Sequence, residues 1–89
     1  MANPVIVATP AGEWTKIVTG SKNADIYVMS GSPTQYIQTI RDTGETAPDA
    51  ADKLAEGVTM DEFTRLDSAV ERDVYIWCVG SDGIVRVDA

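Results

Sequence analysis

The strongest constraint on the fold of this 89-residue chain is the stretch DVYIWCVGSDGIVRVD, which spans Asp73 to Asp88. Two runs of β-branched and aromatic residues flank a glycine-containing turn, residues 80–83, and this pattern predicts a β-hairpin. Alternation gives one wholly apolar face, formed by Val74, Ile76, Cys78, Val85 and Val87. The opposite face carries aromatic, aliphatic and charged side chains, namely Tyr75, Trp77, Val79, Ile84, Arg86 and Asp88. The stretch contains no catalytic constellation.

Shorter segments earlier in the chain repeat this rhythm of strand and turn. Four strands are expected, at Pro4–Thr9, Glu13–Thr19, Ala24–Ser30 and Gln35–Arg41, with turns at 10–12, 20–23 and 31–33. Regularly spaced turns of this kind are typical of β-sandwiches and small barrels. We therefore predict an all-β fold with a single domain over residues 1–89. It is expected to be an antiparallel β-sandwich or a partly closed β-barrel of about seven short strands.

Two segments admit more than one interpretation. Residues 42–57, DTGETAPDAADKLAEG, are acidic and alanine-rich, which favours a long loop with at most a short helix at 49–56 before Gly57. Residues 58–72 fit a helix over 60–71, with a capping box at Thr59 and Glu62, but they also fit a strand. The all-β surroundings favour the strand.

The residue types limit the possible chemistry. The chain has no histidine, which excludes Ser-His-Asp and Cys-His constellations and removes the commonest general base. No glycine pattern resembles a phosphate loop. We therefore expect no enzymatic activity and no cofactor. Carboxylates recur through the acidic segment and its flank, among them Asp42, Glu45, Asp49, Asp52, Asp61 and Glu62. Their spacing matches no calcium loop, so a solvated acidic loop is expected rather than a metal site.

Charge and hydropathy narrow the range of partners. The net charge is −7, with seven basic residues against fourteen acidic ones, so we expect no direct binding to nucleic acid. An acidic surface suits high solubility or docking on a basic partner. The stretch MANPVIVATPAGEW lacks the pattern of a signal peptide, and no apolar run approaches a membrane span. These features predict cytoplasmic synthesis. The single cysteine, Cys78, cannot form an intrachain disulfide and is expected in the core.

The aromatic side chains are the candidates for binding. Tyr75 and Trp77 lie opposite an aliphatic face, so both faces of their strand carry apolar bulk. Either another element covers the aromatic face, or that face is a subunit or partner surface, or it is a platform for stacking carbohydrate. Trp77 is also placed to form a cation–π pair with Arg86 across the hairpin. The candidate interface residues are Tyr75, Trp77, Val79, Ile84, Arg86 and Trp14.

Four passages, taken in order, resemble a known group of proteins. They are ATPAGEWTKI (8–17), YIQTIRDTGETAPDAAD (36–52), Glu56-Gly57, and the closing DVYIWCVGSDGIVRVDA (73–89). Their order is similar to that in small structural proteins of tailed bacteriophages. The resemblance implies a β-sandwich or related barrel that is located in the virion and assembled in the cytoplasm of the bacterial host.

The resemblance also implies a function. We expect a non-enzymatic protein that decorates or stabilises the capsid through an apolar-aromatic surface for docking or self-association. Its partner would be the major capsid protein or another virion protein. A homo-oligomer is expected, and the threefold positions of a capsid favour a trimer over a dimer. The alternatives are a carbohydrate- or receptor-binding module of a fibre or tail, and a small head–tail connector or tail-completion protein.

Overall fold

In the computed structural model, six strands form one antiparallel sheet over the residues that it describes, which are 4–31, 35–50, 57–60 and 63–88. The strands are β1 (Pro4–Thr9), β2 (Trp14–Gly31), β3 (Gln35–Asp42), β4 (Val58–Met60), β5 (Phe63–Val79) and β6 (Gly83–Asp88). Their order across the sheet is β1-β6-β2-β5-β3-β4. These residues contain no helix, which confirms the all-β class.

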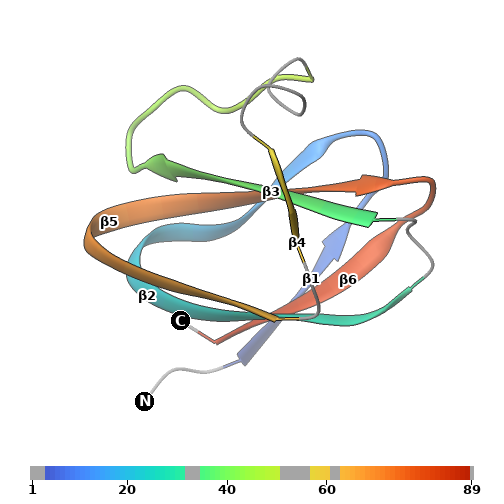
Figure 1. Ribbon diagram of the computed structural model, residues 1–89, viewed down its shortest axis with the longest axis horizontal. Coiled ribbons are helices and arrows are strands. Elements are labelled where there is room, and N and C mark those ends of the chain that lie inside the picture. Colours follow the sequence, from blue (N-terminus) through green and yellow to red (C-terminus); the bar gives the residue numbers. More distant parts are fainter. Residues whose placement is uncertain (1–3, 32–34, 51–56, 61–62, 89) are drawn as a thin grey trace.

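The sheet bends across its two longest strands, β2 and β5 (Figure 1). The beginning of β2 pairs with the end of β5, as at Trp14 and Trp77, and the end of β2 pairs with the beginning of β5, as at Tyr27 and Phe63. β6 and β1 extend the sheet from the end of β2, whereas β3 and β4 extend it from the end of β5. One sheet therefore folds into two layers, which we call the β6 layer and the β3 layer. It does not close into a barrel.

A buried carboxylate stands at the bend. Asp73 of β5 is 4% exposed, and its Oδ1 accepts hydrogen bonds from the backbone N–H of Gly20 at 2.8 Å and from Thr43 Oγ1 at 3.3 Å. Lys16 Nζ lies 3.6 Å from its Oδ2. Gly20 has a φ of +60°, a left-handed conformation that glycine adopts without a steric penalty. The bend is therefore fixed by contacts between residues far apart in the sequence.

The sequence predicted that a turn at residues 20–23 separates two strands, and this prediction is wrong. The two strands expected on either side of it are a single strand, β2, because residues 20–23 form a bulged segment that stays paired with β5. Register shifts between Lys16 and Asn23 absorb the irregularity. The count therefore falls from about seven short strands to six in the described residues, and two of these have 18 and 17 residues.

The apolar core lies between the two layers. From the β6 layer it receives Ile26, Leu66, Val85 and Val87, and from the β3 layer Val18, Tyr36, Val74, Ile76 and Cys78. The phenol of Tyr36 crosses to β6, where its Oη accepts a hydrogen bond from the backbone N–H of Ile84 at 3.3 Å. Burial raises the pKa of this phenol. A Cβ at Gly83 would lie 2.6 Å from two ring carbons of Tyr36, so the ring requires glycine there.

The hairpin predicted over residues 73–88 is wrong, although its alternation is confirmed. β6 pairs with β1 and β2, and β5 pairs with β2 and β3, so residues 80–82 carry the chain from one layer to the other. The five side chains predicted to share an apolar face are all at most 3% exposed. They meet across the core from the two layers instead of lying side by side in one layer. The predicted pair of Trp77 with Arg86 is also wrong, because Arg86 lies over the ring of Tyr27.

The ambiguous segments are largely resolved. Residues 63–72 belong to β5, so the strand interpretation is confirmed and the helix over 60–71 is wrong for those residues. Residues 61–62 lie outside the described ranges. The described part of the acidic loop, 43–50, contains no helix, and residues 51–56 of the possible helix at 49–56 also lie outside.

Candidate interaction surface

The aromatic side chains of β5 are covered by the chain itself. Tyr75 and Trp77 are 6% and 9% exposed on the outer side of the β3 layer. The indole of Trp14 packs edge-to-face on that of Trp77, with ring centroids 5.5 Å apart. Trp14 Nε1 donates a hydrogen bond to the backbone carbonyl of Asp49 at 2.6 Å. Pro48, next to Asp49, is buried. The acidic loop therefore contacts Trp14, and Trp14 in turn packs on Trp77.

The six predicted interface residues consequently fall into two groups. Trp14, Tyr75, Trp77 and Val79 lie in the β3 layer, where all four are buried or half-buried. Ile84 and Arg86 lie on β6, on the outer side of the other layer. The structure does not bring the two groups together on one surface. The sequence left open whether another element covers Tyr75 and Trp77. In the structure both side chains are covered.

A different apolar surface lies on the outer side of the β6 layer. The register places Ile6 of β1, Arg86 of β6, Tyr27 of β2 and Phe63 of β5 in one row across four strands. Ile6 is 56% exposed and Phe63 is 43% exposed. Met29 and Ile84, on the same side by alternation, add exposed apolar area beside the row. We call these six residues, Ile6, Tyr27, Met29, Phe63, Ile84 and Arg86, the Tyr27 face.

Ring contacts hold the centre of the Tyr27 face. The rings of Tyr27 and Phe63 are tilted against each other with centroids 5.0 Å apart. The guanidinium of Arg86 lies 4.4 Å from the centre of the Tyr27 ring, which is a cation–π distance. Each of these side chains already contacts a neighbour, which restricts its rotamers. A docking partner would therefore cost little additional side-chain conformational entropy.

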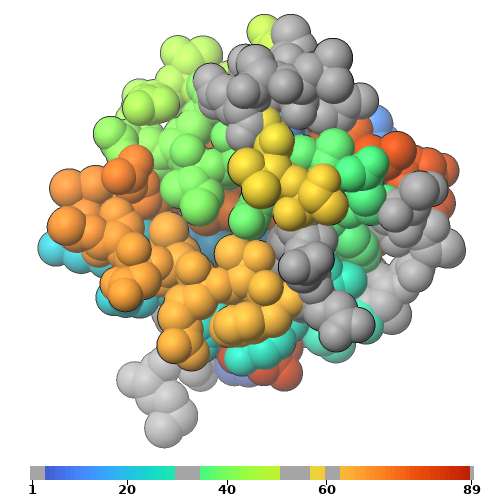
Figure 2. All heavy atoms as spheres, in the orientation of Figure 1, coloured from blue at the N-terminus to red at the C-terminus, as the bar shows by residue number. Residues whose placement is uncertain are grey.

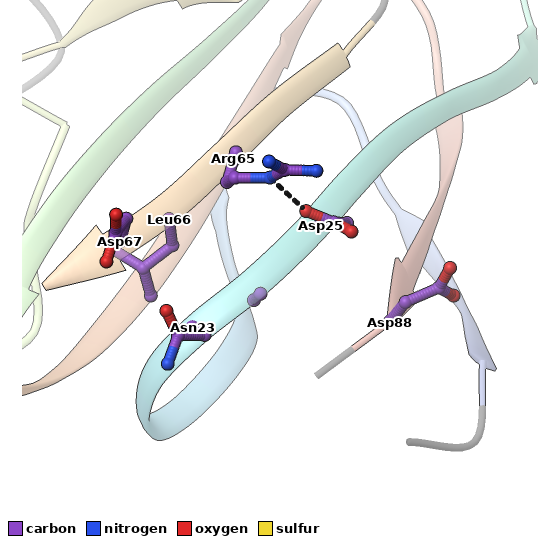
Figure 3. Close-up of a pocket in the computed structure, with 7 residues that line it drawn as sticks. Asn23, Asp25, Arg65, Leu66, Asp67 and Asp88 are labelled. Carbon is purple, nitrogen blue, oxygen red and sulfur yellow. Dashed lines mark hydrogen bonds and ion pairs between the residues drawn. The ribbon is translucent and has the colours of Figure 1, made fainter. Parts of the chain in front are cut away.

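The two arginines beside the Tyr27 face are each paired with a carboxylate. Arg86 Nη2 lies 2.9 Å from Asp88 Oδ2, and Arg65 Nε lies 2.9 Å from Asp25 Oδ1. The hydrogen bond to each carboxylate raises the pKa of its arginine. Figure 3 shows Arg65 and Asp25 directed toward each other from neighbouring strands. This side of the molecule therefore carries two balanced pairs, although the chain as a whole has a net charge of −7.

The described residues also line open hollows on the surface. One of about 350 Å³ lies beside the Asp25–Arg65 pair and is open to solvent (Figure 3). Within the described ranges, no group of three His, Cys, Asp or Glu side chains could hold a metal ion. Two further exposed apolar side chains, Ile40 and Val58, lie on β3 and β4, which meet on the surface seen in Figure 2. They form a smaller patch, next to the acidic loop.

Cys78 behaves as a core residue. Its side chain is fully buried, and its Sγ lies 3.1 Å from Thr9 Oγ1. Burial raises the pKa of the thiol, which disfavours the reactive thiolate.

No helix among the residues described is long and apolar enough to cross a membrane.

Comparison with known proteins adds no assignment. No family model, no curated protein and no solved structure matches this chain.

Sequence reasoning missed four members of the Tyr27 face. Tyr27 and Met29 carried a usable signal, because they are apolar residues on the side of their strand opposite Ile26 and Val28. Phe63 lay in a segment where helix and strand were both open, so its side could not be assigned. Ile6 was hidden in a continuous apolar run without alternation.

Proposed function

We propose that this chain is a non-enzymatic structural protein of a tailed-bacteriophage virion, and that its Tyr27 face docks on the major capsid protein or another virion protein. The observation that carries the proposal is the row of exposed and half-buried side chains across four strands, from Ile6 to Phe63, with ring contacts at its centre. Aromatic residues, methionine and arginine are the residue types enriched at the centres of protein interfaces.

The electrostatics favour a protein partner. Docking removes the surface charges of an interface from water, and this is costly unless each charge keeps a partner. Around the Tyr27 face the two arginines are already paired with Asp25 and Asp88. The net charge of −7 would steer the protein toward a basic partner surface.

The alternative functions predicted from the sequence require different kinds of surface. A carbohydrate-binding module would need an exposed aromatic platform, and Trp77, on the aromatic face considered for that role, is buried beneath Trp14. A connector or tail-completion protein would use a protein–protein surface like the one proposed here. These functions therefore differ mainly in copy number.

The test is quantitative mass spectrometry of particles purified from the source that encodes this chain. We expect a copy number close to that of the major capsid subunit, as decoration requires. A handful of copies per particle would instead indicate a protein of the connector, tail or fibre. Complete absence from the particles would overturn the virion proposal.

A further inference from the structure

We propose that two copies of this chain associate through β1, whose free edges pair antiparallel about a twofold axis and join the two sheets into one. This inference goes beyond docking on a virion protein and does not depend on it. It concerns the backbone edge of β1, whereas the docking proposal concerns the outer side of the β6 layer.

β1 has a neighbour on one side. It pairs in register with β6 over six residues, from Pro4 opposite Asp88 to Thr9 opposite Gly83. In the described sheet β1 is the terminal strand, so the backbone groups along its other side are unpaired by the sheet. Only the end of β1 is enclosed, where Thr9 is buried beside Cys78 and Ala11 bridges to the same residue. An open edge of this kind is a template for a further strand.

The residues of β1 do little to resist such pairing. Native edge strands are protected by charged side chains, bulges or prolines. The strand PVIVAT has no charged residue and no register shift, and its proline stands at the first position. Val5 and Ile6, which point to opposite sides, are 54% and 56% exposed. A continuous apolar run is typical of a strand that is covered on both faces.

The absence of carboxylates from β1 favours a second copy of this chain as the strand that pairs with its free edge. Two copies with a net charge of −7 each repel one another, so they can only meet where carboxylates are absent or neutralised. β1 contains no carboxylate, and Asp88, which lies opposite Pro4, is paired with Arg86. The other terminal strand, β4, has three residues and follows the acidic loop. Antiparallel pairing of identical strands is also self-complementary, because each residue meets its counterpart from the same sequence.

The pairing has a defined symmetry. Two identical strands that pair antiparallel are related by a twofold axis, so the contact makes a dimer, whereas the sequence-based expectation ranked a trimer first. The two sheets become continuous through β1, with the Ile6 side chains of both copies near the axis. The two Tyr27 faces then lie beside each other on one surface, available to the same partner.

The test is sedimentation equilibrium of the purified chain up to about 1 mM, a concentration at which even weak pairing is populated. We expect a dimer. The double variant Val5→Lys/Ile6→Lys should raise the dimer dissociation constant at least about tenfold, because it places like charges at the axis. The matched control is Val58→Lys/Val70→Lys, which charges two exposed valines on β4 and β5 and should leave the dimer unchanged. Thermal melting confirms that both variants fold.

Amide hydrogen exchange of the wild-type chain provides a second readout that needs no variant. A strand with one neighbour protects alternate amides, whereas a strand between two neighbours protects consecutive ones. We expect consecutive protection over Val5 to Ala8 that declines on dilution. A chain that remains monomeric at about 1 mM, a trimer, or a dimer broken only by the β4 and β5 substitutions would each overturn the proposal.

Discussion

Replacing Asp73 by alanine tests the physical reason for the bend in the sheet. The carboxylate is 4% exposed and accepts hydrogen bonds from the backbone of Gly20 and the hydroxyl of Thr43, with Lys16 as its charge partner. Asp73→Ala removes all three interactions and leaves a partly buried N–H of Gly20 without its acceptor. The substitution therefore acts at the point where β2 and β5 pass from one layer to the other.

The magnitude follows from these contacts. A hydrogen bond to a charged group contributes roughly 1.5–3 kcal/mol, and Gly20 supplies the short one at 2.8 Å. The longer bond from Thr43 and the ion pair with the part-exposed Lys16 add less. We expect Asp73→Ala to lower the free energy of unfolding by about 3 kcal/mol, which corresponds to a fall of roughly 12–24 °C in the melting temperature. Asp73→Asn keeps an acceptor oxygen and should cost about half as much.

Urea denaturation and thermal melting followed by circular dichroism measure both variants. Asp67→Ala is the matched control, because Asp67 is an exposed aspartate on the same strand. It should change the free energy of unfolding by less than about 0.5 kcal/mol. If Asp73→Ala were as stable as Asp67→Ala, the bend would not depend on this carboxylate and the explanation given for it would be wrong.

Three further substitutions test the packing. Gly83→Ala should cost about 1–3 kcal/mol in denaturant melts, because its Cβ displaces the ring of Tyr36; full stability would show that the ring has room to move. Trp77→Ala should cost about 3–5 kcal/mol, since the side chain is 9% exposed; loss of self-association at unchanged stability would contradict this burial. The raised pKa of Cys78 favours its neutral thiol in the folded state, so its contribution to stability is complete below about pH 8.5 and is lost as the pH rises through the folded pKa. Cys78→Ala should therefore flatten the alkaline decline in melting temperature, and an unchanged decline would exclude Cys78 as its source.

Side-chain alternation was predictable because it depends only on the local period of a strand. Ile76 and Val85 were assigned to the interior correctly, although the hairpin expected to hold them together does not form. The residues at 80–83 encode a reversal of the chain. They do not encode which strand β6 will pair with, and it finds β1 and β2 instead of β5.

The features that could not be predicted depend on contacts distant in sequence. Residues 20–23 have the composition of a turn, yet they continue β2, because the N–H of Gly20 bonds to a carboxylate 53 residues away. The sequence left open whether Trp77 is exposed, and in the structure Trp14, which bonds to the backbone of Asp49, packs on its indole. The Tyr27 face arises only when the register of β2, β5 and β6 brings its members into one row. That register depends on pairing between segments far apart in the chain, which the local pattern of a strand does not reveal.

The central claim, that the Tyr27 face holds this chain on its virion partner, is tested most directly by competitive incorporation into particles. Equal amounts of wild-type chain and an isotopically labelled Tyr27→Ala/Phe63→Ala variant are supplied during assembly, and their ratio in purified particles is measured by mass spectrometry. A labelled Val70→Ala chain, altered at an exposed valine outside the face, is the control. We predict that the control incorporates equally and that the double variant is depleted at least about tenfold, as expected for loss of central interface residues. Equal incorporation of a folded double variant would contradict the account.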